Sequence, residues 1–99
     1  MLQIERNLEN GKMLLQLIGR VDTTTAPKLE EIIVGCEKDI SEMIMDMAQL
    51  EYISSAGLRV ILKAQKMMNR QGKLILRNVN EAIEEVFEIT GFIDILTIE

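Results

Sequence analysis

Two adjacent serines, Ser54 and Ser55, carry the most evident chemistry in this sequence. They stand just before Gly57, where a loop passes into the longest helical pattern of the chain. A serine at a helix start can accept a hydrogen bond from a backbone N–H group, and a nearby glycine lets the helix approach a sheet closely. A serine in the same place can also be phosphorylated, because free N–H groups and the positive end of the helix dipole stabilise a phosphate there. The residues by themselves leave both interpretations open.

The helix that begins at these serines is expected to present three different faces. At about 100° per residue, one side should face the core and the opposite side should carry a basic stripe. The stripe is either a solvated helix face or a surface that pairs with an acidic partner. Leu58 and Leu62 project to the side, as exposed interface anchors or as side chains packed under a neighbouring loop. The core-facing residues are Gly57, Val60, Ile61, Ala64, Met67 and Met68, and the basic stripe consists of Arg59, Lys63, Lys66 and Arg70.

The composition argues against most catalytic chemistry. The chain has 99 residues, no histidine and one cysteine, Cys36, so neither a Ser-His-Asp nor a Cys-His arrangement can be built and no cysteine cluster can hold zinc. We therefore expect no enzymatic activity, no metal and no cofactor. Eleven basic against sixteen acidic residues give a formal charge of -5, which argues against nucleic-acid binding.

The location of the protein is predicted from its apolar segments. Charged or amide side chains interrupt every apolar run well before the roughly 20 residues that a spanning helix needs. Charges within residues 1–10 stand where a signal peptide would have its apolar segment. We therefore expect a cytoplasmic protein that does not insert into a membrane.

Hydrophobic periodicity and turn residues predict one α/β domain over residues 1–99. Asn10-Gly11 indicates a hairpin turn, the segment from Asp22 to Thr25 can cap a helix, and Cys36 is expected to be buried on the apolar stripe of that helix. The expected elements are strands at 2–6 and 13–21, a helix at about 26–36, a strand at 43–47 covered on both faces, a helix at 55–71, a strand at 73–79, a helix between Asn80 and Gly91, and a last strand at 93–98. This order, ββαβαβαβ, predicts a mixed sheet that is parallel at the helical crossovers, with amphipathic helices packed against it.

Three segments resemble the STAS-domain family of anti-sigma factor antagonists. The segment Ile53-Ser54-Ser55-Ala56-Gly57-Leu58 is similar to the family's motif at the start of a helix. The segment Gly19-Arg20-Val21-Asp22, followed by threonines and Ala26, is similar to its Gly-x-x-Asp segment before the first helix. Asp46, expected at the end of the middle strand, is a third match. The resemblance covers essentially the whole chain and implies a STAS-like fold.

The resemblance also implies a partner switch controlled by phosphorylation. The unphosphorylated chain would bind an anti-sigma factor that is also a serine protein kinase, and would thereby release a sigma factor for transcription. The kinase would phosphorylate Ser55, with Ser54 as the competing acceptor, and a PP2C-type phosphatase would remove the phosphate. Asp22 matches the acidic residue near that serine, where it either hydrogen-bonds the hydroxyl or caps the neighbouring helix. The expected partner surface comprises Asp22, Thr23, Ser54, Ser55, Gly57, Leu58, Arg59 and Leu62.

The same fold also serves as a constitutive interaction subunit, for example in lipid-transport ABC systems. In that case the two serines would act as helix caps only.

Overall fold

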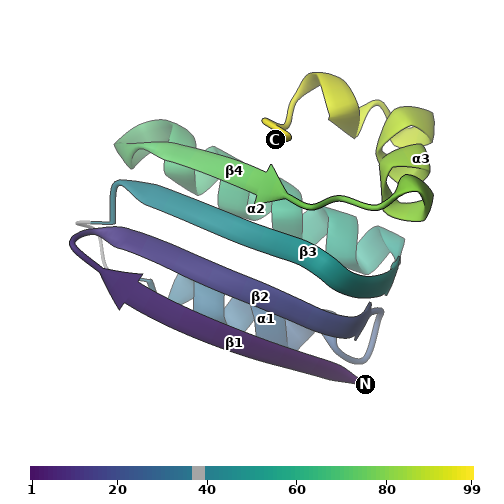
Figure 1. Cartoon of the computed structure of the whole chain (residues 1–99), viewed down its shortest axis with the longest axis horizontal. Coiled ribbons are helices and arrows are strands. Elements are labelled where there is room, and N and C mark those ends of the chain that lie inside the picture. Colours follow the sequence, from purple (N-terminus) through teal and green to yellow (C-terminus); the bar gives the residue numbers. More distant parts are fainter. Residues whose placement is uncertain (37–39) are drawn as a thin grey trace.

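The computed structural model describes residues 1–36 and 40–99, which form a four-stranded sheet in the order β1-β2-β3-β4 with three α-helices (Figure 1). The elements are β1 (Leu2–Glu9), β2 (Lys12–Val21), α1 (Ala26–Val34), β3 (Glu42–Ile53), α2 (Ser55–Gln71), β4 (Lys73–Arg77), α3 (Glu81–Thr90) and the short 3-10 helix η1 (Phe92–Asp94).

The first two strands form the expected hairpin. β1 pairs antiparallel with β2, and Asn10 and Gly11 both adopt positive φ angles, 52° and 79°. Two left-handed residues make the type of tight turn whose twist matches that of the flanking strands, and asparagine followed by glycine suits it best. β1 continues to Glu9, beyond the predicted limit at residue 6.

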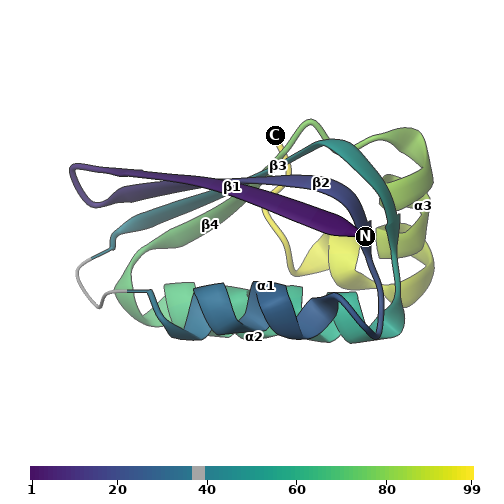
Figure 2. The same ribbon diagram turned by 90° about the horizontal axis from the view of Figure 1, so that it is seen from below.

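The remaining strands are parallel, as predicted for strands that are joined through helices. β2 pairs with β3 and β3 with β4 in parallel register. The connecting helices α1 and α2 lie side by side on one face of the sheet, and no helix of the described residues covers the opposite face (Figure 2). α3 stands at the end of the sheet where β3 leads into α2. The mixed sheet with amphipathic helices packed against it is thereby confirmed.

The core lies between the sheet and the pair α1 and α2. Met43, Met45 and Met47 are fully buried and belong to the core. The prediction of a short strand covered on both faces was wrong, because β3 has 12 residues and Ile44 and Asp46, on its other face, are only half-buried. Asp46 therefore lies inside the strand and not at its end.

The last predicted strand, at residues 93–98, was also wrong. Gly91 adopts a left-handed conformation with φ 82°, η1 follows it, and Ile98 makes a single parallel bridge with Leu76. β4 offers little to pair with, since it has five residues and the chain turns away at Asn78, where φ is 58°. An apolar run of this length does not distinguish a strand from a compact turn that covers the core.

The first helix ends two residues before Cys36. α1 stops at Val34, so Cys36 lies beyond the helix and is half-buried rather than fully buried on its apolar stripe. Ala26, Leu29 and Ile33 supply the buried side of this helix.

Candidate functional site

The parallel pairing of β2 and β3 brings two loops together at one edge of the sheet. Val21 and Ile53 are register partners at the ends of the two strands, and the N–H group of Ser54 donates a hydrogen bond to the carbonyl oxygen of Val21 over 2.8 Å. The carboxyl ends of parallel strands commonly carry the functional side chains of α/β proteins. The segment that starts at Asp22 and the serines that open α2 therefore lie side by side, although about thirty residues separate them in the chain.

The two serines have different structural roles. Ser54 is the N-cap of α2, with extended backbone angles, and its Oγ accepts a hydrogen bond from the N–H group of Gly57 over 3.4 Å. Ser55 is the first residue of the helix and is exposed. Within residues 1–36 and 40–99, no side-chain hydrogen bond involves the Ser55 hydroxyl. Ser54 is thus a cap, as one of the two interpretations predicted, whereas the hydroxyl of Ser55 is open to solvent.

Gly57 allows α2 to start directly against the sheet. A Cβ atom at this position would lie 2.7 Å from Cγ1 of Val21 and 2.7 Å from Cγ1 of Ile53. This close approach places the first turn of the helix over the ends of β2 and β3.

Leu58, which follows Gly57, is 6% exposed and belongs to the hydrophobic core. Of the two roles predicted for its side chain, that of an exposed interface anchor was therefore wrong. Leu62 is half-buried. Arg59 and Thr23 are exposed and, unlike the buried Gly57 and Leu58, can contact a partner through their side chains.

Asp22 caps the turn that leads into α1. Its Oδ1 atom accepts hydrogen bonds from the backbone N–H groups of Thr24 and Thr25, at 3.0 and 3.1 Å, and from the Thr24 hydroxyl at 2.8 Å. The hydroxyl of Thr24 is the main cause that lowers the pKa of Asp22 below its usual value, with the two backbone N–H groups acting in the same direction. Asp22 thus stabilises the turn before α1, whose N-cap residue is Thr25 and has no side-chain cap hydrogen bond, and no hydrogen bond joins Asp22 to Ser55 within the described residues. These hydrogen bonds favour the charged form of the carboxylate.

The sequence interpretation missed a contact between Arg20 and Tyr52 beside these loops. The two residues are register partners at the ends of β2 and β3, and the Arg20 guanidinium lies 4.4 Å from the centre of the Tyr52 ring. Such a cation–π contact holds two side chains in place at the surface. Tyr52 is 41% exposed, so part of an aromatic ring borders the site. The pairing of the two strand ends was the signal that would have revealed it.

The predicted basic stripe lies at the surface over its whole length. Arg59, Lys63, Lys66 and Arg70 are all exposed on α2. Lys63 Nζ forms an ion pair of 2.9 Å with Glu30 Oε2 on α1, which joins the two helices across their outer side.

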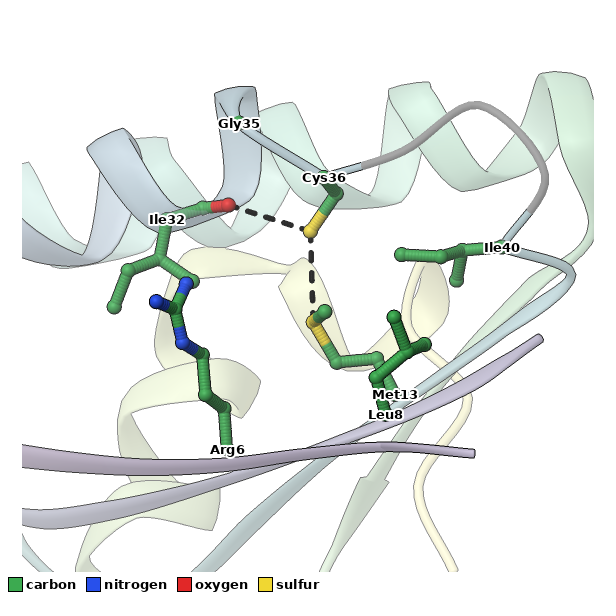
Figure 3. A pocket seen from close by; sticks show the side chains of 7 residues that line it. All are labelled: Arg6, Leu8, Met13, Ile32, Gly35, Cys36 and Ile40. Carbon is green, nitrogen blue, oxygen red and sulfur yellow. Dashed lines mark hydrogen bonds between the residues drawn. The ribbon is translucent and has the colours of Figure 1, made fainter. Parts of the chain in front are cut away.

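A pocket lies away from the serines, between the hairpin and the end of α1 (Figure 3). This cavity of about 320 Å³ is bordered by Cys36, whose Sγ lies 3.5 Å from Met13 Sδ and 3.3 Å from the Ile32 carbonyl oxygen. Burial raises the pKa of the Cys36 thiol, with a smaller opposing effect from Arg6. A raised pKa favours the unreactive thiol over the thiolate, which agrees with a packing role for this residue.

Two further features bear on the class of site. The residues that the structure describes hold no group of three or more acidic or sulfur side chains suited to a metal ion. No helix among them is long and apolar enough to cross a membrane.

The chain is similar to known proteins over nearly its full length. The STAS domain family model matches residues 2–99. The protein BtrV of Bordetella bronchiseptica, which has the provisional name of an anti-sigma factor antagonist, is 37% identical over 91 residues, covering 90% of this chain and 78% of its own. The anti-sigma-B factor antagonist of Bacillus subtilis is 32% identical over 85 residues, covering 85% of this chain and 78% of its own. The structure of the Bacillus cell fate determinant SpoIIAA in its phosphorylated form shares the fold, with a TM-score of 0.76, 18% identity and coverage of 100% of this chain and 91% of that chain.

Proposed function

The chain belongs to the STAS domain family, and we propose that it acts as a cytoplasmic anti-sigma factor antagonist that is switched by phosphorylation of Ser55. In this proposal the unphosphorylated chain binds an anti-sigma factor that is also a serine protein kinase, and a sigma factor is released. The chain itself carries out no reaction. The observation that carries the proposal is the exposed Ser55 hydroxyl at the start of α2, beside the Asp22 loop.

The surroundings of Ser55 support its use as the phosphate acceptor. Ser54 already caps the helix, so a modification of Ser55 leaves that hydrogen bond in place. A phosphate on Ser55 would lie at the positive end of the α2 dipole, and Arg59 lies one turn further along the same exposed side. In the kinase reaction the Ser55 oxygen bonds to the γ-phosphorus of ATP, ADP leaves, and the hydroxyl proton passes to a base of the kinase.

The same surroundings explain how phosphorylation would release the partner. The phosphate adds a charge of about -1.5 to -2 at neutral pH. The surface around it already holds the Asp22 carboxylate. A partner that fits closely over Ser55 and Thr23 would meet both added bulk and repulsion. A PP2C-type phosphatase would restore the binding form by hydrolysing the phosphoester.

The proposal is tested by capturing the anti-sigma factor from cells that express the tagged chain. We expect unmodified protein and Ser55→Ala to retain the partner and Ser55→Asp to lose it. Ser41→Asp is the matched control, because it adds the same negative charge at an exposed serine just before β3, at the end of the sheet away from Ser55, and should keep the partner. Mass spectrometry of the chain from its own cells should place a phosphate on Ser55 that a serine phosphatase removes.

Two results would contradict the proposal. If Ser55→Asp binds as tightly as the unmodified chain, phosphorylation of Ser55 is not the switch. If the chain stays unmodified under several growth conditions and copurifies with a transporter ATPase, it is a constitutive subunit of that assembly.

A further inference from the structure

The charges of this acidic chain are strongly segregated. α2 contains four of the eleven basic residues and no acidic residue. The rest of the chain therefore holds seven basic and sixteen acidic residues, a formal charge of -9. A helix with a charge of +4 on such a protein creates a local field that attracts acidic surfaces.

The far half of this basic stripe borders a groove between α1 and α2. The two helices lie next to each other on the same face of the sheet, with their outer sides uncovered (Figure 2). The groove has a volume of about 340 Å³ and contains both apolar and cationic side chains. Its lining consists of Ile33, Val34, Lys63, Lys66, Met67 and Arg70.

The apolar side chains of the groove are available for contact. Val34 is 60% exposed and Met67 is half-buried. Methionine adapts its shape to different apolar partners because its side chain is flexible and polarizable. The groove therefore offers an apolar strip with cations along one side.

Two of the cations in the groove have no acidic partner in the described part of the chain. Lys63 pairs with Glu30, but no carboxylate of residues 1–36 and 40–99 lies within 4 Å of Lys66 or Arg70. Both side chains line the groove and are exposed.

We propose that the groove between α1 and α2 binds an acidic amphipathic helix of the partner protein. Such a helix would place apolar residues on Val34 and Met67 and carboxylates opposite Lys66 and Arg70, the usual pattern of a helix bound in a groove. A nucleic acid fits less well, because the groove is partly apolar and the whole chain is acidic. The inference rests on the proposed function in taking the anti-sigma factor as that partner.

The groove would act as a second contact that is independent of the phosphorylation site. Lys66 lies eleven residues after Ser55, which corresponds to about 16 Å along a helix. This separation exceeds the screening length of about 8 Å at physiological salt, so a phosphate on Ser55 changes the potential at the groove only weakly. Phosphorylation would then weaken the contact at the start of α2 and leave the groove contact intact.

The test compares two charge reversals of equal size in a Ser55→Ala chain, which cannot be phosphorylated there. Lys66→Glu with Arg70→Glu changes the groove, and Lys12→Glu with Arg77→Glu changes the opposite face of the sheet. Binding of the captured anti-sigma factor is measured by isothermal titration at low and physiological salt. We expect the groove variant to bind about tenfold more weakly, with a smaller dependence on salt, and the control to stay within about threefold.

The possible failures separate the two hypotheses. If the groove variant binds as tightly as the control, the groove inference is wrong and the proposed function stands. If the Ser55→Ala chain binds no anti-sigma factor, the proposed function fails and the inference fails with it. Thermal unfolding followed by circular dichroism checks that both variants remain folded, which is expected because Lys12, Lys66 and Arg70 are exposed and Arg77 is only half-buried.

Two further measurements address other occupants of the groove. Self-association seen by sedimentation velocity and abolished by Lys66→Glu with Arg70→Glu would assign the groove to a second copy of the chain. Binding to phosphatidylglycerol vesicles that the same variant abolishes would assign it to a lipid surface. Either result would overturn the inference. A chain that stays monomeric and does not bind the vesicles agrees with it.

Discussion

Separate replacement of Ser54 and Ser55 by alanine tests the division of roles on which the proposed switch depends. In the structure, Ser54 Oγ accepts the hydrogen bond that caps α2, whereas Ser55 is exposed at the first helical position. Ser54→Ala should therefore destabilise the fold, and Ser55→Ala should leave its stability nearly unchanged.

The expected loss follows from the geometry of the cap. The distance of 3.4 Å from Ser54 Oγ to the Gly57 nitrogen is long for a hydrogen bond, which favours the lower part of the range of about 0.5–2 kcal/mol measured for such caps. Gly57 is buried, however, so its N–H group would lose a partner that water replaces poorly. Together these effects suggest a loss of about 1 kcal/mol in the free energy of unfolding, or about 4–8 °C in Tm for a chain of this length. Ser55→Ala should stay within about 0.5 kcal/mol.

Urea unfolding followed by far-UV circular dichroism measures the change in the free energy of unfolding for Ser54→Ala and for Ser55→Ala. The chain has no tryptophan and one tyrosine, so the helical signal reports unfolding better than fluorescence does. Loss of stability in Ser55→Ala with no effect of Ser54→Ala would refute the reasoning, because Ser55 would then be the cap and Ser54 the available hydroxyl.

Three other changes test the site and the core. Gly57→Ala should cost about 1–3 kcal/mol in urea unfolding, despite the better helix propensity of alanine, because its Cβ atom would crowd Val21 and Ile53 at 2.7 Å; an unchanged midpoint would show that α2 can shift away from the sheet. The pKa of Asp22 is lowered in the folded chain, so its carboxylate stabilises the fold above the usual titration range near pH 4, and this contribution is lost as the pH falls through the folded value. The Tm of Asp22→Asn should accordingly be below that of the parent at pH 7, and the difference should shrink as the pH falls below the usual titration range of an aspartate, whereas a difference that does not depend on pH would contradict this role of the charge. Met45→Ala removes a fully buried side chain and should cost about 2–5 kcal/mol by thermal unfolding, and a loss below 1 kcal/mol would show that the core closes around the gap.

Local features of the chain were predictable from the sequence because they depend on residues a few positions apart. The Asn10-Gly11 turn needs only two residues that tolerate positive φ, and the caps of α2 and α3 need only a polar side chain three residues before a helical N–H group. The basic stripe followed from the period of a helix.

The predictions that failed concern contacts that come from distant parts of the chain. Leu58 projects to the side of the core-facing residues of α2, and other parts of the protein cover it. Residues 93–98 have the apolar pattern of a strand, but a strand needs a long edge to pair with, and β4 ends at Arg77. The length of a neighbouring strand is not a property of the segment itself.

The sequence by itself determined the local chemistry of this protein: a capping serine next to a second serine at a helix start, an acidic loop residue, and a helix with cations on one side. Only the tertiary structure decided how these parts meet. The parallel pairing of β2 with β3 places the loop of Asp22 beside Ser54, and the packing of α1 against α2 forms the groove that the basic stripe borders. The physical reason is that strand pairing and helix packing bury apolar surface between residues far apart in the chain, and this burial selects the arrangement of the whole fold.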